Sequence, residues 1–261
     1  MPARLSNYQG PVARSMATAT WSFLGVLALT AAVCGAADTQ RFSLTSPDGL
    51  KLLDVSAEPA RLEGKKGLRV IMPKDLRARI MAMDSAARQR AAQAGELPRD
   101  LAVIEGLEFG DGTIEVDVAG EPLPDAPEGA RGFVGIAFRV KKDWRTYDAF
   151  YLRPTNGRAD DQLRRNHAAQ YISHPDWPWY RLRDESPGKY ESYVDLESGK
   201  WTHIRIEVRG AQARLYVHGS VQPTLIVNDL KSGAGASGAI GLWLDIDTLA
   251  HFRNLSVTRT R

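Results

Sequence analysis

Cysteine is almost absent from this sequence: its 261 residues include a single one, Cys34. Residues 1–37 have the layout of a secretory signal, so we expect cleavage to remove that cysteine. A mature chain without cysteine has no disulfide framework, no cysteine-ligated metal and no thiol nucleophile. These kinds of stabilisation and chemistry are therefore excluded.

The expected signal opens with Arg4 and Arg14 and continues with the apolar run WSFLGVLALTAAVCGAA. That run of roughly 17 residues is at the lower limit for crossing a bilayer, and it ends in small residues rather than a basic anchor. A retained membrane anchor is the alternative. We predict cleavage near Ala36 or Ala37, export to the periplasm or the extracellular space, and no membrane insertion of the mature chain.

An excess of positive charge is missing as well. The chain has 34 Lys and Arg against 31 Asp and Glu, and loss of Arg4 and Arg14 would lower the net charge from +3 to about +1. Nucleic acid binding needs a basic surface that neutralises phosphates, so no nucleic-acid partner is expected. The mature chain, 38–261, is long enough for one large β domain or two small ones, and we predict a single domain.

Short alternating segments separated by Gly, Pro and Asn turns dominate the mature chain. In GTIEVDVAG (112–120), Ile114, Val116 and Val118 alternate with acidic residues, which is the period of a half-buried strand. About a dozen such segments predict an all-β fold of two antiparallel sheets packed as a sandwich. The other expected strands include YDAFYLRP (147–154), NHAAQYIS (166–173), YESYVDL (190–196), WTHIRIEVRG (201–210), GAIGLWLDI (238–246) and LAHFRNLSVT (249–258).

One segment departs from this pattern, PKDLRARIMAMDSAARQRAAQAGELP (73–98). Its apolar residues recur at helical spacing from Leu76 to Ala87, and Gly95 and Pro98 supply a stop. We predict one inserted amphipathic helix over about 74–95. Its apolar stripe is interpreted as a packing surface rather than a partner-binding face.

Alternation also assigns a row of aromatic side chains to the outer face of one sheet. In 147–154, Phe150 and Leu152 are expected in the core, on the side opposite Tyr151. A row of outward aromatics favours a groove that a ligand occupies or that long loops such as 154–189 cover, and these two interpretations are compatible. The expected outward set is Tyr147, Tyr151, Arg153, His167, Tyr171, Tyr193 and Trp243.

The C-terminal half carries a family resemblance. KWTHIRIEVRGAQARLYVHG (200–219), GAIGLW (238–243) and HFRNLSV (251–257) resemble the concanavalin A-like lectin/glucanase (LamG-like) sandwich. More narrowly, they are similar to secreted domains of the 3-keto-disaccharide hydrolase type. The resemblance covers about 60 residues and implies a jelly-roll sandwich that binds carbohydrate or acts on glycosides.

The sequence differs from that superfamily in the catalytic motif. Glucanases of the superfamily use a catalytic E-x-D-x-(x)-E strand. Here Glu115 and Asp117 begin the pattern, but the next acidic residue, Glu121, comes too late and stands beside Pro122. The resemblance therefore implies the fold and leaves catalysis open.

Two residues are the candidates for catalysis, Glu191 and His167. Glycoside cleavage ordinarily uses two carboxyl groups, and Glu191 is expected on one strand face with Tyr193 and Asp195. His167 could serve as a general base on the same face.

No cofactor is expected. His167 and His174 are seven residues apart without a third ligand nearby, which resembles no zinc pattern. A structural calcium ion at Asp160 or Asp161 is left open, because calcium takes oxygen ligands in loops.

The segment 151–183 is the most distinctive, with six arginines, no lysine and the aromatic turn Trp177-Pro178-Trp179. Its arginines either contact a ligand through their planar forks or brace the loop by pairing with Asp160, Asp161 and Asp176. The side chains predicted to bind ligand are Tyr147, Tyr151, Arg153, Asn156, Arg158, Asp161, Gln162, Arg164, Arg165, Asn166, His167, Tyr171, His174, Trp177, Trp179, Arg181 and Tyr193.

Three functions fit these observations. We favour a secreted, lectin-like sandwich that binds a carbohydrate, or another polyhydroxylated and in part anionic ligand, in a groove built from 147–195. An enzyme acting on glycosides, of the 3-keto-disaccharide hydrolase type, is the first alternative. A structural or adhesion module of the cell envelope is the second.

Overall fold

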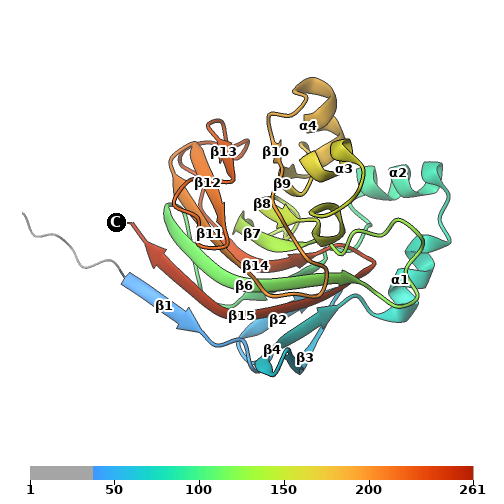
Figure 1. The fold of residues 1–261 in the computed structure, drawn as a ribbon, viewed down its shortest axis with the longest axis horizontal. Helices are drawn as coiled ribbons and strands as arrows, with labels where there is room; N and C mark the ends of the chain where they lie inside the picture. The colour runs from blue at the N-terminus through green and yellow to red at the C-terminus, as the bar shows by residue number, and fades with distance from the viewer. Residues whose placement is uncertain (1–37, 261) are drawn as a thin grey trace, which may run out of the picture. The chain divides into compact units, whose positions relative to one another are not determined.

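The computed structural model describes residues 38–260, which form two antiparallel sheets (Figure 1). The predicted signal, 1–37, lies outside the described residues. Within 38–260, no helix has the length and apolarity needed to span a bilayer.

The first sheet has eight strands, and its order brings the C-terminal strand to the middle. The order is β13 (Leu225–Val227), β12 (Gln212–Val217), β11 (Thr202–Arg209), β6 (Gly112–Pro122), β15 (Thr248–Arg259), β4 (Lys65–Ile71) and β3 (Ser56–Leu62), with β1 (Asp38–Phe42) also paired to β15.

The second sheet has seven strands. Its order is β10 (Glu191–Ser192), β9 (Ala169–His174), β8 (Tyr147–Leu152), β7 (Val134–Val140), β14 (Ala239–Leu244), β5 (Leu101–Ile104) and β2 (Leu50–Leu53). The predicted two-sheet sandwich is confirmed, and the expected strands 147–154, 201–210, 238–246 and 249–258 all form in it.

The core lies between the sheets, where the alternation placed it. On β11, Ile204, Ile206 and Val208 are buried while His203 and Arg209 are exposed. Because successive side chains of a strand point to opposite faces, every second residue of β11 enters the core. The same rule holds on β14, whose residues Ile240, Leu242 and Leu244 are fully buried.

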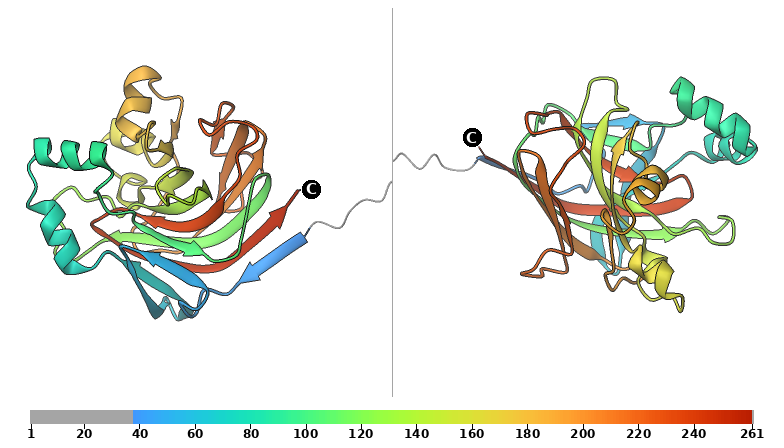
Figure 2. Two further views of the ribbon diagram at one scale, coloured as in Figure 1. Left: turned by 180° about the vertical axis from the view of Figure 1, so that it is seen from behind. Right: turned by 90° about the horizontal axis from the view of Figure 1, so that it is seen from above.

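The helical segment expected over about 74–95 consists of two helices, α1 (Lys74–Met81) and α2 (Ser85–Ala94). They are separate because the Asp84 carboxylate accepts a hydrogen bond from the Ala87 amide at 2.7 Å and starts a new helix. Gly95 ends α2 in the left-handed conformation, at φ 68°, as the sequence predicts. Figure 2 shows both helices at one end of the sandwich, away from β12 and β13.

The connection after β8 differs most from the expectation. Residues 166–173 were expected as one strand, but α3 (Gln162–Asn166) ends there, His167 caps it, and β9 begins at Ala169. Tyr171, expected on the outer face, is fully buried in the core, because the ladder pairs it with Phe150. The rest of the connection holds η1 (Pro154–Asn156) and α4 (Trp179–Glu185), and only two residues of the expected strand 190–196 form β10.

Candidate functional site

The site is built on the outer face of the seven-stranded sheet. Tyr147 and Tyr151 of β8 point there with Trp243 of β14, as the alternation predicts: the Trp243 Nε1 donates to Tyr147 Oη at 3.1 Å, and the Tyr151 and Trp243 rings are 4.7 Å apart. Phe133 also stacks on Tyr151, at 5.4 Å between ring centroids. These rings form an aromatic floor.

The long connection between β8 and β10 covers this floor, as the second interpretation of the aromatic row expected. Figure 1 shows α3 and α4 on the side of β8 and β9 that faces away from the eight-stranded sheet. Tyr147, Tyr151 and Trp243 are buried beneath it, whereas Trp179 and Tyr180 of α4 remain 40 % and 61 % exposed. The connection therefore provides exposed aromatics above a buried aromatic floor.

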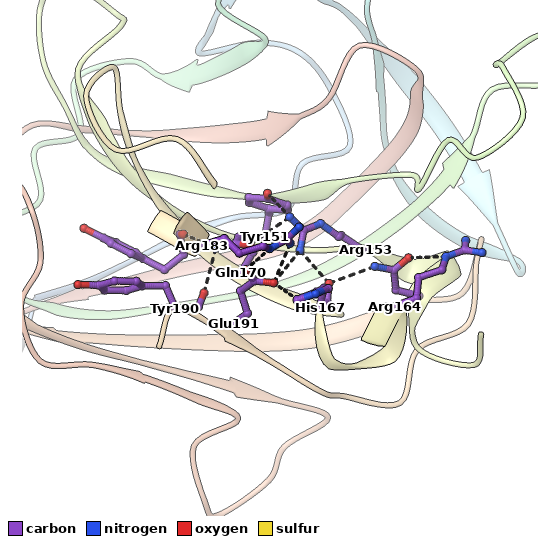
Figure 3. Close-up of polar contacts among 10 residues, drawn as sticks. Tyr151, Arg153, Arg164, His167, Gln170, Arg183, Tyr190 and Glu191 are labelled. Carbon is purple, nitrogen blue, oxygen red and sulfur yellow. Dashed lines mark hydrogen bonds and ion pairs between the residues drawn. The ribbon is translucent and has the colours of Figure 1, made fainter. Parts of the chain in front are cut away.

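A cluster of charged groups joins the connection to the sheet (Figure 3). Arg183 of α4 donates from Nε to Glu191 Oε1 at 2.7 Å and from Nη2 to Glu191 Oε2 at 2.8 Å. The Glu191 side chain is almost fully buried, and its Oε2 also contacts His167 Nδ1 and lies 3.9 Å from Arg153 Nη1. One carboxylate thus holds together groups from α3, α4 and the end of β8.

The electrostatics of this cluster favour a neutral His167. Burial lowers the pKa of its imidazole, the Glu191 charge opposes that shift, and the Arg183 and Arg153 charges add to it. Neutral imidazole can exchange a proton with a ligand near neutral pH.

Arg153 is fixed by neutral partners. Its Nη1 donates to the His167 carbonyl at 2.9 Å, and its Nη2 donates to Tyr151 Oη at 2.9 Å and to Gln170 Oε1 at 3.1 Å. The guanidinium therefore keeps one defined position above the floor.

Three cavities open around Trp179, which lines all of them. The largest, here called the aromatic groove, measures about 820 Å³. Its walls are Leu163, Asn166, His167, Trp179, Tyr180, Arg183, Asp184, Pro187, Gly188, Glu191, Ser192 and Tyr193. Polar groups of the charged cluster therefore form the base of a groove whose rim is aromatic.

The second cavity, the arginine cavity, measures about 420 Å³ and shares His167, Trp179 and Arg183 with the aromatic groove. Its lining is Gly129, Arg131, Phe133, Arg153, Asn156, Arg164, His167, Trp179, Arg183 and Asp245.

The third, the acid cavity, measures about 360 Å³ and lies on the aromatic floor. Two carboxyl groups enter it, because Asp100 precedes β5 and Asp245 follows the neighbouring strand β14. Burial raises the pKa of Asp245 to about 6, and burial with the Asp245 charge raises the pKa of Asp100 well above its usual range. Asp100 Oδ1 is buried without a hydrogen-bond partner among the described residues.

The structure brings most of the predicted site residues to these three cavities. Those that line at least one cavity are Tyr147, Tyr151, Arg153, Asn156, Arg164, Asn166, His167, His174, Trp179, Glu191 and Tyr193.

The other predicted residues hold the connection in place. Arg158 pairs with Asp195 and Glu197, Asp161 caps α3, and Gln162 bonds to Asn166. Arg181 pairs with Glu185 and stacks on Trp177, Arg165 donates to the Tyr193 hydroxyl, and Tyr171 is a core residue. Several arginines therefore do brace the connection through ion pairs. Their partners are Asp195, Glu197, Glu185 and Glu191, and not the expected Asp160, Asp161 and Asp176.

Six charged lining residues are absent from the predicted site residues: Asp100, Arg131, Arg145, Arg183, Asp184 and Asp245. Of these, only Arg183 belongs to the six arginines of 151–183. The available signal for Asp245 is alternation along 238–246, which puts it on the same face as Trp243. Asp100 and Arg131 stand outside the segment 147–195, so no local pattern pointed to them. Among residues 38–260, no group of three or more His, Cys, Asp or Glu side chains converges as a metal site.

Comparison with known proteins finds similar solved structures but no matching family. No family model matches the sequence, and no curated protein does. Among solved structures, the chain is similar to the carbohydrate-binding module CBM66 from Bacillus subtilis, at 13 % identity and a TM-score of 0.41, over 79 % of this chain and 97 % of that one.

Two further solved structures show the same level of similarity. A Bacillus subtilis protein with a galectin-like fold matches at 13 % identity and a TM-score of 0.47, over 86 % of this chain and 96 % of its own. Domain 4 of AbnA, an extracellular arabinanase from Geobacillus stearothermophilus, matches at 12 % identity and a TM-score of 0.40, over 85 % of this chain and 82 % of its own. The function has to be argued from the cavities.

Proposed function

We propose that this protein is an exported carbohydrate-binding protein whose ligand lies in the aromatic groove between α3, α4 and β10. The observation that carries the proposal is Trp179, a large side chain 40 % exposed at the meeting point of three cavities. Exposed aromatic side chains around a concave surface lose the benefit of burial unless a ligand covers them.

The groove has the chemistry that a sugar needs. Trp179, Tyr180 and Tyr193 offer apolar faces to a sugar ring, and Asn166 and Ser192 offer amide and hydroxyl groups to its hydroxyls. A volume of about 820 Å³ accommodates more than one sugar ring. The ligand is therefore expected to be an oligosaccharide or a polysaccharide chain.

Affinity electrophoresis on gels containing polysaccharides tests the proposal. The wild-type protein should be retarded on at least one polysaccharide, and Trp179→Ala should lose the retardation while keeping its thermal midpoint. Trp144→Ala, at the separate cavity beside Lys51, is the matched control and should bind as the wild type does. Equal retardation of all three proteins would contradict the proposal.

An enzyme acting on glycosides is the second candidate, and the acid cavity supports it. A carboxyl group that holds its proton near pH 6 can act as a general acid, and Asp100 beside Asp245 supplies a second carboxyl group. Glu191 is less suited to that role, because both of its oxygens are held by Arg183. His167 remains the candidate base at the groove.

Turnover of chromogenic glycosides and 3-keto-glycosides distinguishes the two candidates. An enzyme should lose turnover in Asp245→Asn or His167→Ala while still being retarded on the polysaccharide gel. A binding protein should show no turnover by the wild type under conditions in which it binds.

A further inference from the structure

The arginine cavity has more positive charge than its neighbours neutralise. Four guanidinium groups line it, those of Arg131, Arg153, Arg164 and Arg183, and they come from three separate parts of the chain. Asp245 is the one carboxylate in the lining. Glu191 is outside the lining but pairs with Arg183 and lies 3.9 Å from Arg153. Two positive charges remain in excess even when both carboxylates are ionised.

The excess positive charge is carried by Arg164 and Arg131. Arg183 is paired with Glu191, and Arg153 lies within 3.9 Å of the same carboxylate. Arg164 bonds only to neutral groups, Asn156 Oδ1 at 3.1 Å and Thr155 Oγ1 at 3.2 Å, among the residues the structure describes.

Arg131 is less satisfied still: within 38–260 its side chain makes no hydrogen bond and no ion pair. Burial lowers the pKa of Arg131, and repulsion from Arg164 and Arg153 lowers it further. Like charges brought together in a half-buried cavity are unfavourable unless an anion joins them.

We propose that the arginine cavity binds an oxyanion carried by a sugar, such as the carboxylate of a uronic acid or a sulfate ester. A guanidinium fork matches both groups in geometry. The inference rests on the proposed carbohydrate binding and names the class of carbohydrate.

Continuity with the aromatic groove supports a sugar as the carrier of the charge. Trp179, His167 and Arg183 line both cavities, so a ring stacked at Trp179 lies beside the arginines. The chain of an acidic polysaccharide would occupy the aromatic groove, and one charged substituent would enter the arginine cavity. Arg131 and Arg164 would then discriminate between acidic and neutral chains.

Isothermal titration with matched pairs of ligands tests this inference. Oligogalacturonate is compared with its methyl-esterified form, which has the same rings without the charge, and sulfated dextran oligomers are compared with unsulfated ones. The acidic member of one pair should bind at least about tenfold more tightly, because a hydrogen bond between two charged groups is stronger than one between neutral groups. The pair that shows the difference identifies carboxylate or sulfate.

Three variants locate the effect. Arg131→Gln and Arg164→Gln should each reduce that discrimination about tenfold or more, and Arg131→Gln should keep the thermal midpoint because its side chain has no bonds to lose within 38–260. Arg214→Gln, an exposed arginine on β12 of the other sheet, is the control of equal charge and should bind as wild type.

Each other outcome has a defined meaning. Equal binding of the charged and neutral members of both pairs would overturn the anionic inference and leave carbohydrate binding standing. Equal losses in all three arginine variants would indicate nonspecific attraction of polyanions and would overturn it too. If no sugar of either kind binds, the proposed function fails together with the inference.

Discussion

Arg183 holds both carboxylate oxygens of Glu191, at 2.7 and 2.8 Å, and this pair ties α4 to the edge of the seven-stranded sheet. The carboxylate is almost fully buried while the guanidinium stays about one third exposed at the groove. The pair therefore links the stability of the connection to the shape of the ligand site.

Glu191→Gln should destabilise the protein by about 3–5 kcal/mol, because it leaves the buried Arg153 and the partly exposed Arg183 without the carboxylate that they share. Urea unfolding followed by tryptophan fluorescence measures the change. Glu185→Gln is the matched control, since Glu185 pairs with Arg181 on the same helix but at the surface. That variant should lose less than about 1 kcal/mol. Similar losses in both variants would show that Glu191 does not anchor α4.

Arg139 is a second anchor, and it lines none of the three cavities. Its side chain is fully buried and donates to Asp111, Ser232 and three backbone carbonyls, at 2.8–3.1 Å. Arg139→Met should cost about 3–5 kcal/mol of unfolding free energy, because it leaves these acceptors without donors. Arg214→Met, at an exposed position, should change the urea midpoint little. A stable Arg139→Met variant would show that water replaces the guanidinium.

The stability of the protein should depend on pH through Asp245. Its pKa is raised to about 6 in the folded protein, from an ordinary value of 3.8, so the folded state binds this proton more tightly. The resulting stabilisation is complete below about pH 4 and disappears as the pH rises through about 6. Asp245→Asn should therefore be the more stable protein at pH 7, by up to about 3 kcal/mol.

Urea midpoints of Asp245→Asn and wild type between pH 4 and pH 8 measure this difference. Asp176→Asn, at an exposed position, is the matched control and should follow the wild type. Parallel pH profiles for Asp245→Asn and wild type would show that this carboxyl group is solvated as in the unfolded chain.

His174 should remain neutral well below its ordinary titration range. Burial lowers its pKa to about 4, and its ring lies 5.1 Å from that of Tyr147 in the acid cavity. Stability from the neutral imidazole is present above about pH 6.5 and is lost as the pH falls toward 4. The imidazole resonances in NMR spectra, assigned with a His174→Asn variant, should show no titration above about pH 5. A midpoint near 6.5 would mean that water reaches the ring.

The fold was largely predictable from the sequence because its signal is local. Alternation along β8, β11 and β14 places Tyr151, Ile206 and Trp243 on the correct faces, since a strand has a side-chain period of two whatever it packs against. The helical segment was also recognisable, although the cap at Asp84 divides it. Tyr171 was misplaced because its face depends on where β9 begins, and a shift of one residue reverses it.

The sequence alone also determined where aromatic and arginine side chains gather, in 151–183, but only the tertiary structure decided their roles. It separated Arg158 and Arg181, which brace the surface, from Arg164, which lines a cavity. It also brought Arg131 and Asp245 to that cavity from distant parts of the chain. Such contacts depend on strand order and on how the connections fold back, which no local periodicity encodes.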